Sequence, residues 1–170
     1  MFKRVGGWVL FLAAMGGLAG LAGCDQKRIA ELEEGVATEA DVRAKFGEPA
    51  AVYGEENGAR TFEYPRQPAG QVNYMITIGA DGKMSALRQV LKEATFVKVT
   101  PGMDKSQLRR LLGRPAKTQV YELKQQEVWD WHFRHENNDN KLFSVTLDKN
   151  GLVLSTAIAL DPRTNLPGGS

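Results

Sequence analysis

The sequence predicts an α+β protein in which one helix-and-sheet unit occurs twice. Residues 38–49 and 104–115 match at a constant offset of 66 positions, and each stretch has the pattern of a short capped helix that ends in glycine and proline. After each helix the apolar residues change from a helical period to strict alternation, which is typical of half-buried strands. An apolar N-terminal segment ends at the only cysteine of the 170 residues, and this segment predicts the cellular location of the two units.

The N-terminal segment has the features of a secretory signal peptide. A short basic start is followed by the apolar stretch 5–20, which is too short and too rich in glycine to span a bilayer comfortably. Ala22 and Gly23 then form a small-residue cleavage site directly before Cys24. This arrangement resembles the lipobox of bacterial lipoproteins, which implies that Cys24 becomes the first residue and carries fatty acyl chains such as palmitate. The alternative is an ordinary cleaved signal that leaves a free thiol in an oxidising compartment.

The mature chain has no formal net charge. Lys3 and Arg4 are the only charged residues among the first 23, so cleavage leaves 20 basic and 20 acidic side chains. A neutral chain lacks the net basic face that releases counterions from nucleic acid, and we therefore expect no nucleic-acid partner. The single cysteine also excludes a disulfide within the chain.

The chain divides into four predicted segments. Residues 1–23 are the signal peptide, residues 24–92 the first unit, residues 93–160 the second unit and residues 161–170 a disordered tail. The tail is polar and rich in proline and glycine, a composition that buries too little apolar surface to fold.

Each unit contains a helix whose first turn is capped. Thr38 and Asp104 are N-cap acceptors, and Asp41 and Gln107 stand three residues later. Gln107 is long enough for the reciprocal bond of a capping box, whereas the shorter Asp41 fits less well. Both residue patterns therefore predict helices that begin at the residue after the cap.

The ends of these helices are marked by glycine. Gly47 and Gly113 are expected in the left-handed αL conformation, and a proline two residues later prevents the helix from restarting. A further short helix is expected at 29–34 before the first unit, and an extended segment at 94–99 before the second.

Alternating apolar residues predict three strands in each unit. They are residues 60–64, 72–78 and 84–91 in the first unit, and residues 128–133, 141–147 and 152–160 in the second. The dipeptides Asp81-Gly82 and Asn150-Gly151 predict two-residue type I′ turns before the last strand of each unit. Each unit is therefore a helix followed by an antiparallel sheet.

Two faces of the predicted sheets have different chemistry. Trp129, Trp131 and Phe133 alternate, and we expect them to form the core beneath the helix. The opposite face carries four residues that we predict to bind a partner if no helix covers them. These residues are Asp130, His132, Arg134 and, on the sheet of the first unit, Met75. Asp130 and His132 could form a pair, for which a solvent-facing salt bridge is the simpler interpretation.

The second helix and its exit are locally basic. The candidate contacts to anionic lipid headgroups are Lys105, Arg109, Arg110 and Arg114. A solvated helix face explains most such runs and is the alternative interpretation.

No motif of catalysis or metal binding accompanies this scaffold. His132 and His135 are the only histidines, and a spacing of three on a strand places them on opposite faces. The chain has no Gly-x-Ser-x-Gly elbow, phosphate loop or CxxC pair. We therefore expect no enzymatic activity, no metal and no cofactor.

The order of motifs resembles the SmpA/OmlA family of bacterial lipoproteins, whose domain is BamE-like. The resemblance rests on 102–115, with its glycine, capped helix and Gly-Arg-Pro exit, followed by Trp129-Asp130-Trp131. It implies two tandem BamE-like units, each with short helices packed on a three-stranded antiparallel sheet, and no catalysis. It also implies a periplasm-facing lipoprotein that assists β-barrel assembly or other envelope proteins.

Two alternatives remain open. A tandem pair also resembles the layout of β-lactamase inhibitor proteins, which implies a binding module that uses concave sheet faces. The membrane is also open, because the family resemblance favours the outer membrane, whereas Asp25 directly after Cys24 favours the inner membrane under the sorting rule of well-understood lipoproteins.

Overall fold

The structure is a computed structural model that describes residues 21–165. The predicted signal peptide lies outside these residues except for its last three. Cys24 falls within the first helix, α1 (Leu21–Ala30), but its side chain is outside the described part. None of the helices described between residues 21 and 165 has the length and apolar character needed to cross a bilayer.

The chain forms two four-stranded antiparallel sheets with short helices, so the α+β class and the two-unit organisation are confirmed. The first unit contains α1, α2 (Glu39–Phe46), β1 (Ala51–Gly54), β2 (Arg60–Pro65), β3 (Asn73–Ile78) and β4 (Met84–Gln89). The second contains α3 (Glu93–Phe96), α4 (Lys105–Leu112), β5 (Lys117–Tyr121), β6 (Gln126–Arg134), β7 (Asn140–Leu147) and β8 (Val153–Leu160). Two 3₁₀ turns, η1 (Glu122–Lys124) and η2 (Pro162–Asn165), complete it.

Each sheet has four strands rather than the three predicted. The additional strands, β1 and β5, follow the Gly-x-Pro exits of α2 and α4 and pair with β2 and β6. Proline cannot continue the helix and favours an extended chain before it, so these exits lead directly into strands.

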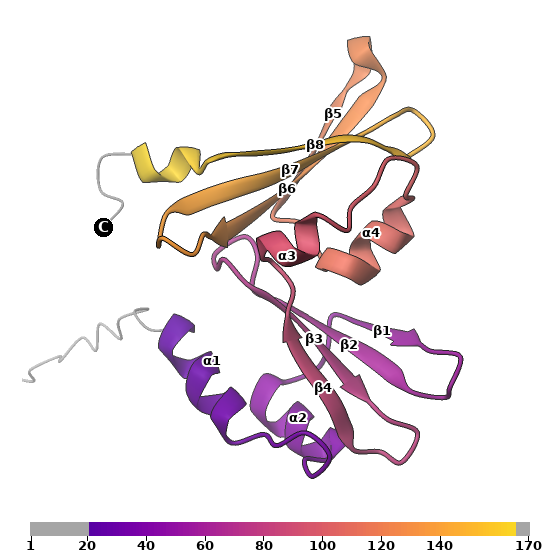
Figure 1. Cartoon of the computed structure of the whole chain (residues 1–170), viewed down its shortest axis with the longest axis vertical. Helices are drawn as coiled ribbons and strands as arrows, with labels where there is room; N and C mark the ends of the chain where they lie inside the picture. Colours follow the sequence, from indigo (N-terminus) through magenta and orange to yellow (C-terminus); the bar gives the residue numbers. More distant parts are fainter. Residues whose placement is uncertain (1–20, 166–170) are drawn as a thin grey trace, which may run out of the picture.

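The elements stack in layers (Figure 1). α1 and α2 cover one face of the first sheet, and α3 and α4 lie between the two sheets. In the described part of the chain, no helix lies on the outer face of the second sheet. The second helix pair therefore has a sheet on each side.

Both predicted caps are present. Thr38 accepts from the backbone N–H of Asp41, and Asp104 accepts from that of Gln107. The carboxylate of Asp41 also accepts from the Thr38 backbone at 2.8 Å, so the shorter side chain closes the capping box after all. Gly47 and Gly113 have positive φ as predicted, but their ψ angles of −161° and −174° lie outside αL, in a region open essentially to glycine.

Two local predictions were wrong. Residues 94–99 are not extended: α3 occupies their start, because this turn buries Phe96 in a stack on Phe143 with ring centroids 4.0 Å apart. The expected helix at 29–34 is displaced toward the N-terminus, where α1 ends at Ala30.

The hairpin turns also differ from the predicted type I′. Gly82 and Gly151 have φ of +78°, whereas Asp81 and Asn150 do not have positive φ. The Gly151 N–H donates to the Asp148 carbonyl at 3.0 Å, which closes a turn with the glycine in its last position. Such longer loops with a terminal glycine and a neighbouring bulge replace the two-residue turn.

Two hydrophobic cores support the sheets. In the first unit, Val42 and Phe46 of α2 pack on Phe62 and Tyr64. In the second, Trp129, Trp131 and Phe133 are buried beneath the helices, as predicted. The aromatic face of β6 is therefore structural, which leaves its other face as the candidate for binding.

Candidate partner-binding site

A buried carboxylate joins the two units. The side chain of Glu63 on β2 has no exposed surface, although it points away from the core of its own unit. It accepts from Arg109 Nε at 3.1 Å, from the Arg114 backbone N–H at 2.8 Å and from the Tyr53 hydroxyl at 2.6 Å. The hydrogen bond to Glu63 raises the pKa of Arg109, and burial followed by the contact with Glu63 raises the pKa of Tyr53 to about 12.

Asn73 completes this inter-unit joint. Its fully buried side-chain amide donates at 2.8 Å to the carbonyl of Leu112, which α4 leaves unpaired at its C-terminal end, and at 3.0 Å to the carbonyl of Arg114 just beyond the helix. Its oxygen accepts from the Arg66 backbone at 3.1 Å. Glu63 and Asn73 together hold the end of α4 against the first sheet.

Met75 is not available to a partner, contrary to the sequence prediction. It faces away from the first core as expected, but it is only 6% exposed and belongs to the hydrophobic cluster of the second unit. The second unit covers this face of the first sheet. Met75 is therefore a contact between units rather than a docking residue.

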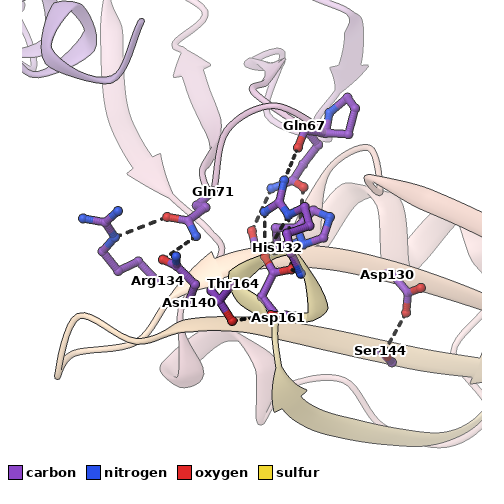
Figure 2. Close-up of polar contacts among 11 residues, drawn as sticks. Gln67, Gln71, Asp130, His132, Arg134, Asn140, Ser144, Asp161 and Thr164 are labelled. Atoms are coloured by element: carbon purple, nitrogen blue, oxygen red, sulfur yellow. Dashed lines mark hydrogen bonds and ion pairs between the residues drawn. The ribbon is translucent and has the colours of Figure 1, made fainter. Parts of the chain in front are cut away.

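The β2–β3 loop of the first unit reaches the second sheet (Figure 2). Gln67 donates to the His132 carbonyl at 2.8 Å and accepts from the His132 N–H at 3.2 Å. β5 pairs with β6 only as far as Asp130, so the side-chain amide of Gln67 takes the place of a neighbouring strand.

His132 is held by the C-terminal segment and is not paired with Asp130 as the sequence suggested. Its Nδ1 lies 2.9 Å from Asp161 Oδ2, although this nitrogen has no aligned hydrogen-bond partner. Burial lowers the pKa of His132, and the positive charge of Arg163 lowers it further, while Asp161 acts in the opposite direction. Its side chain is 13% exposed, so His132 is a poor docking residue.

The predicted disordered tail begins with ordered residues. Asp161 is 1% exposed and receives hydrogen bonds from Arg163, and η2 follows. Arg163 also donates to the Pro68 carbonyl at 2.9 Å, which ties the segment to the first unit. Residues 166–170 lie outside the described part of the chain.

Arg134 also contacts the first unit. Its Nε donates to the Gln71 side chain at 3.2 Å, and Gln71 donates to Asn140 at 2.7 Å (Figure 2). Arg134 is nevertheless exposed overall. A partner could therefore contact Arg134 only beside the β2–β3 loop, which contains Gln71.

Asp130 is half-buried and, unlike His132 and Arg134, makes no side-chain hydrogen bond or ion pair to the first unit or to the C-terminal segment among the described residues. Its carboxylate accepts a hydrogen bond from the Ser144 hydroxyl at 2.6 Å on the outer face of the second sheet (Figure 2). Among residues 21–165, no other hydrogen bond reaches this carboxylate. A carboxylate accepts several hydrogen bonds, so Asp130 keeps free acceptor capacity.

The predicted lipid-contact residues do not form one free basic face. Arg109 is bound to Glu63, and Lys105 forms an ion pair with Glu127. The guanidinium of Arg110 lies 5.0 Å from the centre of the Tyr53 ring. Neither Arg110 nor Arg114 forms an ion pair with the described residues, since the contact of Arg114 to Glu63 uses its backbone N–H.

The described residues contain no group of three or more His, Cys, Asp or Glu side chains that could hold a metal ion. His135 lies apart from His132 and contacts Glu93 at 2.9 Å. The site is accordingly one of hydrogen bonds and ion pairs between chain segments.

No local sequence pattern predicts the roles of Glu63 and Asn73. Both occupy outward positions of alternating strands, where a polar residue normally faces water. Their role becomes visible only when the second unit is placed on the sheet.

Comparison with known proteins supports the similarity inferred for the second unit. Residues 89–157 match the family described as the outer membrane protein assembly factor BamE domain. The second unit is similar in sequence to this domain. The match ends within β8 and begins just before α3, so it spans the part of the chain that contains Asp130 and α4.

Three solved structures share features of the chain. One, described as the osmotically inducible lipoprotein OsmE, is 22% identical, with 40% of this chain and 77% of that chain covered and a TM-score of 0.36. A DUF4309 family protein, YjgB, from Bacillus subtilis subsp. subtilis str. 168 is 18% identical over 76% and 82% of the two chains, with a TM-score of 0.30. A Streptococcus mutans protein described as a β-lactamase inhibitor is 9% identical over 81% and 97%, with a TM-score of 0.33. No curated protein matches the chain.

Proposed function

We propose that this protein is a lipid-anchored, periplasm-facing scaffold that assists the assembly of outer-membrane proteins and performs no catalysis. The observation that carries the proposal is the BamE domain at residues 89–157. The lipobox-like Ala22-Gly23-Cys24 supplies the membrane anchor. The rigid joint at Glu63 and Asn73 suits a scaffold, because it presents the BamE-like unit in a fixed orientation to the anchored unit.

We place the anchor in the outer membrane. Asp25, which taken alone favours the inner membrane, has a structural reason to be acidic. It is 4% exposed and accepts from Arg66 at 2.8 and 3.2 Å, with Arg28 at 3.5 Å. This ion pair holds α1 against the β2–β3 loop, so Asp25 does not need a sorting role to explain its presence.

The test is purification of the full-length protein, with its signal peptide and a C-terminal tag, from the envelope of its native host. We expect components of the β-barrel assembly machinery to be retained, and we expect the protein in the outer-membrane fraction. The matched control is Cys24→Ser, which prevents lipidation and should remove the protein from the outer-membrane fraction and reduce recovery of these components.

Other outcomes contradict the proposal. Stoichiometric recovery of one soluble enzyme indicates an inhibitor-like binding module. Recovery with membrane fragments alone indicates a lipid- or wall-associated structural protein.

A further inference from the structure

The outer face of the second sheet corresponds to the face of the first sheet that the second unit covers. In the first unit, Glu63 pairs across the strands with Ala51 and Met75. In the second, Asp130 pairs in the same way with Lys117 and Ser144. The two carboxylates therefore hold equivalent positions, on the second strand of each sheet and on the face opposite the aromatic core.

The covered face of the first sheet shows which groups bind a carboxylate at this position. Glu63 accepts two hydrogen bonds from an arginine in the last turn of α4, and a further one from the backbone N–H just beyond the closing glycine. Gly113 permits the close approach, because a Cβ there would lie 2.9 Å from Asn73 Nδ2. The recognition element is thus the C-terminal end of a helix with a basic residue and a glycine exit.

The equivalent face of the second sheet is not covered by any helix of the described chain (Figure 1). Besides Asp130, this face carries small or hydroxylated residues on β7 and β8, two apolar residues, and longer polar or aromatic residues on the edge strand β5. They are Ser144, Thr146, Ser155, Ala157 and Ala159, then Val128 and Leu142, and on β5 Lys117, Gln119 and Tyr121. The residues on β8 are exposed, and no helix in the described chain lies over them (Figure 1). Small side chains let another backbone approach closely, and Asp130 retains acceptor capacity.

A second copy of the chain is a poor occupant for this face. The element equivalent to α4 is α2, in which Arg43 corresponds to Arg109. Arg43 is already paired with Glu39 and Glu48 in its own helix region. Glu48 stands where the second unit has Arg114, so stacking another copy would bring a carboxylate toward Asp130.

We propose that the outer face of the second sheet binds the C-terminal end of a helix in a different envelope protein, and that Asp130 accepts from a basic residue in its last turn. This inference rests on the proposed function, since it names the element by which a scaffold partner is recognised. The bound helix would repeat on the second sheet the contact that α4 makes with the first.

The experiment is photocrosslinking in the intact envelope. p-Benzoylphenylalanine is introduced at Ala157, which lies on the outer face across from Ser144, in the full-length lipidated protein. We expect a crosslink to a helix end that contains arginine or lysine. Asp130→Asn should reduce the crosslink yield at least about tenfold, because one member of a charge pair is removed.

Matched controls keep the result specific. Glu136→Gln changes an exposed carboxylate in the same unit and should leave the yield unchanged, and the probe at exposed Ala44 on α2 should not capture this helix. Thermal unfolding of Asp130→Asn, followed by circular dichroism, checks that the fold persists. If Asp130→Asn unfolds, Ser144→Ala, which removes only the neighbouring hydroxyl, replaces it as a probe of the same face with a smaller expected loss.

The decisive outcomes differ from those of the proposed function. A crosslink to a second copy, to lipid or to a segment without a basic helix end overturns the docking site, as does no crosslink or a yield that Asp130→Asn leaves intact. If assembly components are still retained in any of these cases, the scaffold function stands. A basic helix end of a protein unrelated to assembly supports the docking site and contradicts the proposed function.

Discussion

Glu63 shows how one residue can connect two units. Its carboxylate has no exposed surface, yet each oxygen has a donor, from Tyr53, Arg109 and the backbone of Arg114. A buried charge is tolerated when it is both paired and hydrogen-bonded, and removing one member leaves the others unsatisfied.

Replacement of Glu63 should therefore destabilise the protein. We expect Glu63→Ala to lower the free energy of unfolding by about 2 to 3 kcal/mol, because Arg109 is partly solvated and recovers some hydration. Urea unfolding measures the change. Glu56→Ala, at an exposed position, is the control and should have an effect below about 0.5 kcal/mol. Equal effects of the two variants would show that the joint contributes nothing to stability.

His132 predicts a pH dependence of stability. Its pKa in the folded protein lies below the ordinary value of 6.5, so the unfolded chain binds the proton more readily. The stabilisation is fully present above about pH 6.5 and decreases as the pH falls toward the folded pKa. We expect thermal stability to decline from pH 7 to 5, and His132→Asn to flatten that part of the profile. An unchanged slope in the variant would assign the dependence to other groups.

At the scale of the element, α4 has two functions at once. Leu108 and Leu112 face the core of the second unit, while Arg109 and the Gly113 exit contact the first sheet. α2 has the same cap and glycine exit, but nothing lies within 4 Å of a Cβ placed at Gly47. The two helices thus form a natural comparison.

The glycine exits should respond differently to alanine. Gly47→Ala introduces only backbone strain, since its φ is +82°, and should cost about 1 to 3 kcal/mol. Gly113→Ala adds the clash with Asn73, 2.9 Å from the new Cβ, and should cost at least about 1 kcal/mol more. Chemical denaturation of both variants gives the difference. A cost at Gly113 no greater than at Gly47 would mean that the joint relaxes freely.

At the scale of the whole molecule, the two units share one interior. Met75, Val90 and Leu91 belong to the hydrophobic cluster of the second unit, although Met75 lies on the first sheet. The β2–β3 loop and the Asp161 segment add hydrogen bonds across the same boundary. Such an interface couples the stability of the units.

We therefore expect the mature chain to unfold in one cooperative transition. Scanning calorimetry should give equal van't Hoff and calorimetric enthalpies for the wild type. The double variant Glu63→Ala/Asn73→Ala removes the polar joint and should separate the transition into two. Two transitions in the wild type would show instead that the units fold independently.

The sequence by itself determined the local elements of this protein. The caps at Thr38 and Asp104, the glycine exits and the aromatic core face of β6 were all predicted, because each depends on residues close together in the chain. It also predicted the repeat and the lipobox-like segment, which are patterns of residue order. The additional strands β1 and β5 were missed because short edge strands have weak periodicity.

Only the tertiary structure decided which outward-facing residues meet water. Glu63 and Met75 occupy positions that normally face solvent, and Arg109 lies on an apparently free basic helix, yet the docking of the second unit engages all three. Arg109 and Glu63 are 46 positions apart, and no local pattern specifies that contact. The same docking leaves the face around Asp130 open, because no third unit follows in the described chain to cover it.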